Sequence, residues 1–189
     1  MWILIRSWAR WQMSEFLFYK AFSHPGRPQA WAEPGYSCEL WRPSLGALTP
    51  AGLPFLPFGV WWLFHHLRLF SNRGYALFLI RHHGEVVHRS VVTPGYLRFP
   101  FMRKRDLQVG DLLTEPGERG KGLAVYALRA ILSSDDVADR PYWYVVERNN
   151  VASIRAAEKA GFQLVGEGTR TKRLGWRALG SYVVLKEIG

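Results

Sequence analysis

The sequence predicts a mixed α/β fold of the α+β type, in which helices flank a β-sheet, and three observations lead to this prediction. The 189 residues are 48% hydrophobic and 21% charged, which is the balance of one globular domain. From Tyr75 onwards, apolar residues recur at strand spacing and helix spacing in turn. Turns that contain Gly separate these segments. The predicted order from Tyr75 is β-β-β-α-β-α-β-β.

The N-terminal third is the least regular part of the chain. Residues 23–57 hold seven of the eleven prolines and predict loops and short helical turns over the surface. The sequence "FGVWWLFHHLRLFSN" (58–72) predicts a short helix that ends near residues 72–74. The apolar stretch 51–70 contains two Pro, two His and one Arg, and is therefore a poor membrane span. A helix at a membrane interface stays open, but the pattern favours a core helix.

The remaining elements follow in order along the chain. "YALFLIRHHGEVVHRSVV" (75–92) predicts a hairpin that turns at residues 82–84. Strand–helix–strand spacing then predicts a parallel crossover in a mixed sheet. A second helix is capped by Asn149 or Asn150 and ends at Gly161, a residue suited to the left-handed cap. The predicted ranges are strand 106–114, helix 120–132, strand 141–147, helix 149–161 and closing strands 162–172 and 181–188.

The net charge of +10 favours anionic partners such as nucleic acid, an acidic membrane surface or a phosphate-rich cofactor. Two basic clusters lie at residues 98–105 and 170–177. The only cysteine, Cys38, excludes an intramolecular disulfide and fits a cytoplasmic protein. Residues 1–11 lack the features of a signal peptide, and Met13 is an alternative start. The adjacent His pairs give poor metal geometry, so we expect no metal.

One Gly-rich turn, in "TEPGERGKGLAVYALRAIL" (114–132), joins a predicted strand to a predicted helix. Bare N–H groups at such a helix start bind anions. No Gly-Lys pair is followed by Ser or Thr, which excludes a P-loop, and Val125 stands where a dinucleotide fingerprint needs Gly. What remains is Arg119–Ala124, which fits [QR]-x-x-G-x-[GA] with small residues where backbone must approach phosphate oxygens.

A second motif narrows the possibilities. "NNVASIRAAEKAGFQLVG" (149–166) resembles the N-x-x-S…E-K-x-G-F element of the GNAT superfamily of acyl-CoA N-acyltransferases. "LLTEPGERGKGLAVYAL" (112–128) resembles the pyrophosphate-binding motif of the same superfamily. The resemblance covers residues 74–189. It implies one GNAT-like domain over 1–189, with a centrally splayed sheet, an acyl-CoA-binding core in 74–189 and a variable part, 1–70, that shapes the acceptor site.

The resemblance also implies the residues that hold acetyl-CoA or another acyl-CoA. The pantetheine arm would lie between the strand that ends at Thr114 and the strand that ends near Glu147. Asn150 would hydrogen-bond the arm beside Ser153, although both residues also suit a simple helix cap. The implied cofactor-binding residues are Leu113, Thr114, Arg119, Gly120, Lys121, Gly122, Leu123, Ala124, Asn150 and Ser153.

The catalytic groups are less well defined. Many family members use a Tyr as general acid four residues before the closing Gly, and this chain has Ala157 there. Tyr144, Tyr182 or water would have to replace that acid. For the general base, Asp111 is our first choice, because a carboxylate desolvated in a half-buried strand has a raised pKa. The other candidates for the base are His88, which suits the neutral pH range, and Glu147.

The resemblance implies direct transfer of an acyl group to a primary amine on a small-molecule or carbohydrate-linked acceptor. The alternative is a non-catalytic CoA-binding module that docks on nucleic acid or membrane through its basic, Trp-rich surface. We see no strong nucleic-acid motif, and peripheral membrane contact stays open. The sequence leaves monomer and homodimer equally open.

Overall fold

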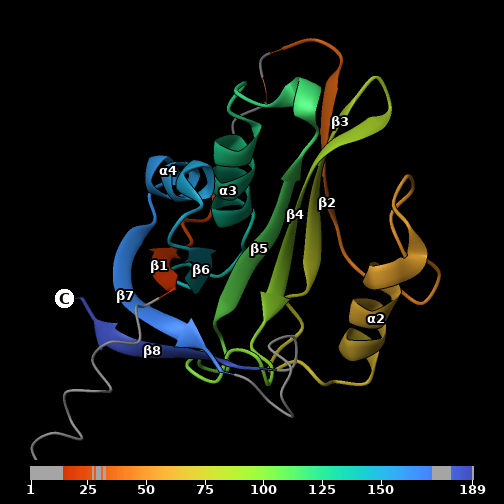
Figure 1. Cartoon of the computed structure of the whole chain (residues 1–189). Helices are drawn as coiled ribbons and strands as arrows, with labels where there is room; N and C mark the ends of the chain where they lie inside the picture. Colours follow the sequence, from red (N-terminus) through yellow and green to blue (C-terminus); the bar gives the residue numbers. More distant parts are fainter. Residues whose placement is uncertain (1–14, 27, 29–30, 32, 172–179, 189) are drawn as a thin grey trace, which may run out of the picture.

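The computed structural model describes residues 15–171, except 27, 29–30 and 32, together with residues 180–188. Eight strands form one mixed sheet in the order β2-β3-β4-β5-β6-β1-β7-β8 (Figure 1). The strands are β1 (Phe16–Phe22), β2 (Tyr36–Trp41), β3 (Ala76–His82), β4 (Glu85–Pro94), β5 (Leu107–Thr114), β6 (Pro141–Glu147), β7 (Gln163–Arg170) and β8 (Tyr182–Glu187). The helices are α2 (Phe55–His66), the 3-10 turn η2 (Pro116–Glu118), α3 (Leu123–Ser133) and α4 (Val151–Ala160).

The predicted mixed fold and its element order after residue 75 are confirmed. β5 and β6 pair in parallel through the crossover helix α3, and every other pair of neighbouring strands is antiparallel. The basic cluster predicted at residues 170–177 falls almost wholly outside the described residues.

The sheet parts in its middle, between β5 and β6. The two strands pair only from Leu107–Val109 to Tyr142–Tyr144. Beyond that point β5 follows β4 up to Thr114, while β6 follows β1 up to Glu147. β5 also carries a bulge, because two of its residues, Asp111 and Leu112, oppose the single residue Ser90 of β4. A bulge bends its strand, so it helps β5 to leave β6.

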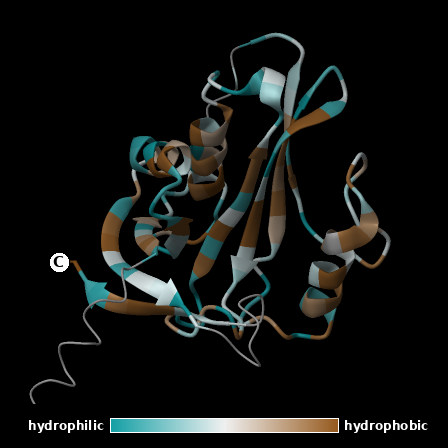
Figure 2. Ribbon diagram, in the orientation of Figure 1, coloured by the Kyte–Doolittle hydropathy of each residue, from teal (hydrophilic) through white to brown (hydrophobic). Residues whose placement is uncertain are grey.

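Helices cover both faces of the sheet. α3 and α4 lie on one face, and α2 lies on the other, against the end that contains β2, β3 and β4 (Figure 1). The first face buries Leu123, Ala127 and Leu128 of α3 against the sheet. The second face forms a smaller cluster around Phe58 and Tyr75. Figure 2 shows brown, hydrophobic segments along these helices and along the strands of the sheet.

Three expectations about the N-terminal third were wrong in part. Residues 36–41, expected in loops, form the edge strand β2, because they pair with β3 along its whole length. α2 ends at His66, well before residues 72–74, because Arg68 takes the left-handed conformation with φ of 57°. The Leu69 N–H then bonds the Phe64 carbonyl at 2.9 Å, which closes the helix end. The expected core helix is confirmed for one side only: Phe58 is buried and Trp61 packs against its cluster, but Val60 and Leu63 are exposed.

Candidate functional site

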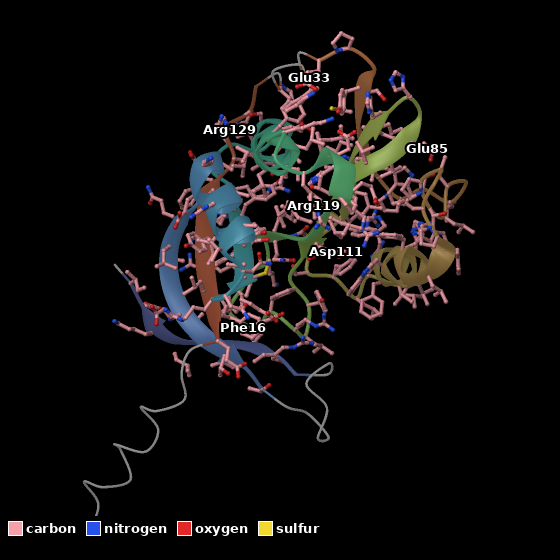
Figure 3. All side chains as sticks on the ribbon, turned by 45° about the horizontal axis from the view of Figure 1, so that its top comes forward. Phe16, Glu33, Glu85, Asp111, Arg119 and Arg129 are labelled. Carbon is pink, nitrogen blue, oxygen red and sulfur yellow. The ribbon has the colours of Figure 1, made fainter. Side chains whose placement is uncertain are left out.

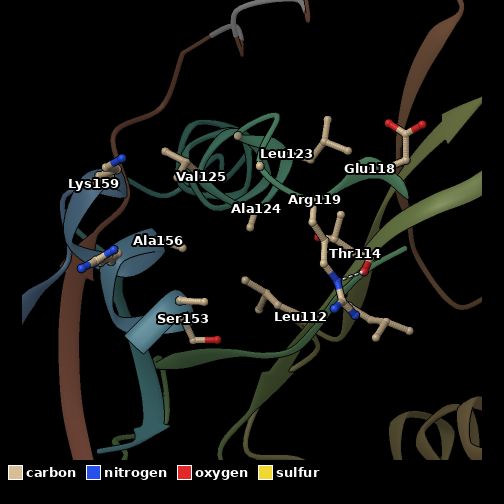
Figure 4. A pocket seen from close by; sticks show the side chains of 15 residues that line it. Leu112, Thr114, Glu118, Arg119, Leu123, Ala124, Val125, Ser153, Ala156 and Lys159 are labelled. Atoms are coloured by element: carbon tan, nitrogen blue, oxygen red, sulfur yellow. Dashed lines mark hydrogen bonds between the residues drawn. The ribbon is translucent and has the colours of Figure 1, made fainter. Parts of the chain in front are cut away.

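A cleft of about 430 Å³ opens where β5 and β6 part, on the face covered by α3 and α4 (Figure 4). The end of β5, the Gly turn, the start of α3 and one side of α4 form its walls. Eight of the ten residues implied as cofactor-binding line it. They are Leu113, Thr114, Arg119, Gly120, Gly122, Leu123, Ala124 and Ser153.

The Gly turn presents backbone N–H groups to this cleft. Gly120 and Gly122 have φ of 83° and 89°, in the left-handed region that favours glycine. The Tyr126 N–H donates to the Gly122 carbonyl at 3.0 Å as the first bond of α3. The N–H groups of residues 123–125 precede that bond, and no side chain caps the helix. These free donors and the left-handed glycines form a concavity that suits a phosphate or diphosphate.

A network of side chains centred on Glu118, which also lines the cleft, holds the turn. Glu118 accepts a hydrogen bond from Lys121 at 2.8 Å and another from the Tyr36 hydroxyl, and it contacts His82 Nδ1 at 3.2 Å. Tyr36 stacks on His82 with ring centroids 4.1 Å apart. The bonds from Lys121 and then Tyr36 lower the pKa of Glu118 to about 2, so the carboxylate stays charged. Lys121 therefore stabilises the turn. It was expected to contact the cofactor, but it is not among the residues that line the cleft.

α4 forms the opposite wall. The Asn150 side chain accepts the Ser153 N–H at 3.1 Å, so Asn150 caps the helix, and it is not among the lining residues. Four other residues of this helix line the cleft and were not predicted from the sequence. They are Ala152, Arg155, Ala156 and Lys159. Arg155, Ala156 and Lys159 follow Ala152 by three, four and seven residues, so the four lie on one face of the helix. Ser153, which was predicted to face the cofactor, lies next to Ala152 and could have indicated this face.

Tyr144 lies at the point where the strands part. It is paired with Val109 in the last parallel rung, is 4% exposed, and packs in the core beneath α3 and α4. Burial raises the pKa of its hydroxyl, and a hydrogen bond with Ser153 lowers it in part. The hydroxyl therefore stays protonated at neutral pH. Its hydrogen-bond partner Ser153 lines the cleft, so the Tyr144 hydroxyl lies one residue away from the cleft.

Asp111 lies in the β5 bulge with φ of 47°. Its carboxylate contacts Arg89 at 3.2 Å, and its charge helps to raise the pKa of the buried Tyr75, after the larger effect of burial. Tyr75 belongs to the cluster under α2, so Asp111 faces the α2 side of the sheet (Figure 3). Its side chain is 53% exposed, so the desolvation supposed from the sequence is absent.

The structure separates the remaining catalytic candidates. His88 is 1% exposed, with Nδ1 at 2.7 Å from the Thr114 hydroxyl and Nε2 at 2.9 Å from the Ser90 hydroxyl. Burial lowers the pKa of His88 to about 4, so it is neutral and supports Thr114 from behind. Glu147 is exposed at the end of β6. Tyr182 stacks on Phe99 with centroids 5.3 Å apart and is not among the residues that line the cleft.

Metal ligands and membrane spans are both absent from the described part of the chain. No group of three or more His, Cys, Asp or Glu side chains there is placed to hold a metal ion. Nor does any helix in these ranges combine the length and apolar character that crossing a bilayer requires.

The comparisons with known proteins find similarity in structure alone. No family model matches the sequence, and no curated protein matches it. Solved structures that resemble the chain include GNAT acetyltransferases. One from Colwellia psychrerythraea has 17% identity and a TM-score of 0.46, over 79% of this chain and 52% of that one. One from Sphaerobacter thermophilus has 15% identity and a TM-score of 0.48, over 79% and 48%. A GNAT-like protein from Streptococcus suis has 17% identity and a TM-score of 0.46, over 86% and 63%.

The chain thus spans about half to three fifths of the length of these structures.

Proposed function

We propose that this chain is an acyl-CoA-dependent N-acyltransferase of the GNAT type, with acetyl-CoA as its expected co-substrate. One observation carries the proposal. β5 and β6 part after three paired residues, and the cleft at the parting is walled by the two motifs that resemble the superfamily. These motifs are far apart in the sequence, and the fold brings them face to face across a space suited to an elongated ligand.

The residues of the cleft fit an acyl-CoA. The N–H groups of the Gly turn and the start of α3 would hold the pyrophosphate. Arg155 and Lys159 of α4 add positive charge on the opposite wall. The apolar side chains of Leu112, Leu113 and Ala156 would contact the less polar arm. Bound acyl-CoA supplies the activated acyl group, and the protein's own part is to position it and to manage protons.

Asp111 is the proposed base. Its carboxylate lies on the face opposite α3 and α4, next to Arg89, which fixes its position. An amine that meets this carboxylate would approach from the α2 side. α2 and β2 both belong to residues 1–70, so this placement supports a single domain whose N-terminal part shapes the acceptor site.

Tyr144 is the proposed acid, because its hydroxyl holds a proton at neutral pH beside Ser153 in the cleft wall. It would replace the Tyr that many family members have in the second helix, where this chain has Ala157. Acid and base then lie on opposite faces of the sheet, at the parting of the strands. Such an arrangement suits direct transfer, in which the amine loses a proton on one side and the sulfur gains one on the other. The proposed acceptor is a primary amine of a small molecule or carbohydrate-linked group in the cytoplasm.

The proposal is tested in two steps. The first is a thermal shift with millimolar acetyl-CoA, in which we expect stabilisation because the ligand binds the native state alone. The second measures release of free thiol across a panel of amino sugars, polyamines, amino acids and aminoglycosides. If no shift appears, the cleft does not bind CoA and the proposal fails. Binding without acylation of any amine would support the non-catalytic CoA-binding module.

A further inference from the structure

The outward side of α2 is apolar, although it is not covered by any described residue. Val60, Leu63 and Leu67 are 44%, 47% and 59% exposed, and their spacing of three and four places them on one side. Phe55 and Leu56, at the start of the helix, are 57% and 65% exposed. The opposite side carries the buried Phe58. α2 therefore carries apolar side chains on both its buried side and its outward side.

Such a helix is unusual at a protein surface. A surface helix in water normally turns a polar face outward, and an all-apolar helix is normally buried. α2 has 12 residues, so it is about 18 Å long and too short to cross a bilayer core of about 30 Å. The outward side of α2 is therefore suited to contact an apolar environment, such as the surface layer of a bilayer, without crossing it.

A basic pocket lies next to the end of α2. It has a volume of about 530 Å³, and five of its eight lining residues are cationic. They are Arg42, Arg73, Lys104, Arg105 and Arg140. Arg140 pairs with Asp135, whereas the other four have no described carboxylate within ion-pair distance. No acidic residue lines the pocket, so its field is positive.

The chain leads from the end of α2 into the basic pocket within a few residues. Arg68 is exposed at the end of the helix, and Arg73 follows five residues later. Burial lowers the pKa of His65, and the charges of His66 and Arg73 lower it further, so Arg73 lies within electrostatic range of the last turn. The Asn72 side chain donates to the Lys104 carbonyl at 2.8 Å and ties the two basic segments together.

This surface is separate from the cleft. Arg105 and Arg140 precede β5 and β6, whereas the cleft lies where these strands end. β5 is eight residues long, so its two ends are roughly 25 Å apart. Figure 1 shows α2 level with the end of the sheet at which β5 begins.

We propose that α2 and the basic pocket together dock the protein on an anionic lipid surface. In this arrangement Val60, Leu63 and Leu67 enter the boundary between headgroups and acyl chains, and the arginines contact lipid phosphates. An amphipathic surface binds membranes by this combination of buried apolar area and attraction to anionic headgroups.

Charge and chemistry favour this occupant over two others. A nucleic acid would match the cations, but it offers no apolar layer for an aliphatic side of a helix. A second copy of the chain would cover the leucines, but it would bring two sets of unpaired arginines together. An anionic bilayer supplies phosphate and hydrocarbon within one surface.

The test is co-sedimentation of the full chain with vesicles of phosphatidylserine and phosphatidylcholine, compared with vesicles of phosphatidylcholine alone. We expect strong binding to the first, weak binding to the second, and a loss of binding as salt is raised. Leu63→Gln should lower the partition coefficient by about tenfold, because burial of a Leu contributes about 1.5–3 kcal/mol. Arg73→Glu should lower it by about tenfold or more, because each cation near such a surface contributes about 1 kcal/mol and the new charge is repelled.

Matched controls exist on β8, at the far edge of the sheet from β2. Leu185 is 50% exposed, close to the 47% of Leu63, and its neighbour Lys186 is exposed as Arg73 is. Leu185→Gln and Lys186→Glu should leave the partition coefficient unchanged. Every variant keeps residues 1–14, so that segment cannot account for a difference. Circular dichroism and the acetyl-CoA thermal shift verify the fold of each variant.

Three results would overturn the proposal. The first is equal partition of Leu63→Gln and the unchanged chain into the anionic vesicles. The second is a dimer in solution that Leu63→Gln dissociates, without vesicle binding, which would assign the surface to a second copy. The third is binding of single-stranded RNA that depends on Arg73 but not on Leu63.

Discussion

The two faces of the sheet differ most at the end of β5. On the α3 and α4 face, the cleft combines backbone N–H groups and small residues with several longer side chains, all from two stretches of chain, 112–125 and 152–159. On the α2 face, the charged groups are side chains from separate strands, with Asp111 of β5 against Arg89 of β4. The first face suits the proposed acyl-CoA, and the second suits the proposed amine acceptor. Changes on the first should therefore alter cofactor affinity, and changes on the second should alter turnover.

The largest effect should come from the α2 face. Asp111→Asn should reduce kcat by about 1000-fold, within the range that general-base catalysis contributes, because the amide cannot take a proton from the amine. The Kd for acetyl-CoA should stay the same. Steady-state kinetics and isothermal titration measure the two quantities. Asn tolerates the left-handed backbone, so Asp139→Asn, at φ of 54°, is the matched control. A normal kcat in Asp111→Asn would remove this residue as the base.

On the cleft face, Gly122→Val should weaken acetyl-CoA binding by about 100-fold. The β-branched side chain strains the left-handed position and displaces N–H groups whose charge-assisted bonds contribute about 1.5–3 kcal/mol each. Gly84→Val is the control, because Gly84 has the same φ of 89° in the β3–β4 turn with nothing near its Cβ position. Both variants should lose similar thermal stability. Equal loss of binding in both would show that the Gly turn has no special role.

A third experiment asks whether His88 belongs to the chemistry or to the scaffold. Its pKa of about 4 in the folded chain lies below its ordinary value of 6.5, so the unfolded state binds more protons between these values. Stability should therefore fall as pH drops from about 6.5 to about 4, and this contribution should be constant below that. Between pH 7 and pH 5 the loss is about 2 kcal/mol, or roughly 30-fold.

Urea unfolding at a series of pH values measures this loss. His88→Gln keeps hydrogen bonds to the two hydroxyls without titrating, so it should abolish this part of the pH dependence. If His88→Gln instead lowers kcat as strongly as Asp111→Asn does, His88 would be the base.

Tyr144→Phe should reduce kcat by about tenfold, the smaller end of acid–base contributions, because water in the cleft can also supply a proton. Since burial raises the pKa of Tyr144, the unchanged enzyme should keep this activity as pH rises to 10, and should lose it only above the raised pKa. Tyr142→Phe is the control, because the Tyr142 hydroxyl lies on the same face but donates to Asp135 at 2.8 Å. A kcat equal in Tyr144→Phe and the unchanged chain would leave water as the acid.

The smallest effect should come from the rim of the cleft. Lys159→Ser should weaken acetyl-CoA binding by about threefold in dilute buffer, because an exposed charge contributes about 0.2–1 kcal/mol. The difference should vanish at high salt, where exposed charges are screened. Lys186→Ser serves as the control. A larger and salt-independent effect would mean that Lys159 is a buried partner of the ligand. Side chains would then contribute to cofactor binding as much as the backbone N–H groups do.

The same difference between the two faces explains what the sequence could predict. The Gly turn and the start of α4 were found because their function needs particular residues at fixed spacing. Lys121 was assigned to the ligand, since no local pattern announces its bonds to Glu118 and Tyr36. Tyr36 lies in β2, a strand that was not predicted because the prolines around it favour loops.

Long-range contacts account for the other errors. Arg68 ends α2 by adopting a conformation for which sequence patterns expect Gly or Asn. The β5 bulge moves Asp111 to the α2 side, and a bulge leaves no trace in the alternation of residues that would reveal it. Such features depend on how neighbouring strands pair, which becomes visible only in the fold.

The three-residue seam between β5 and β6 has a consequence for the order in which the chain is made. It divides the sheet into two antiparallel groups of four strands, β2 to β5 and then β6, β1, β7 and β8. The first group is complete once Thr114 has left the ribosome. The second holds β1 between β6 and β7, so it cannot begin to form until β6 has been made, up to Glu147. Until then the apolar strand Phe16–Phe22 has no partner, and the nascent chain carries it exposed, as a site for chaperones.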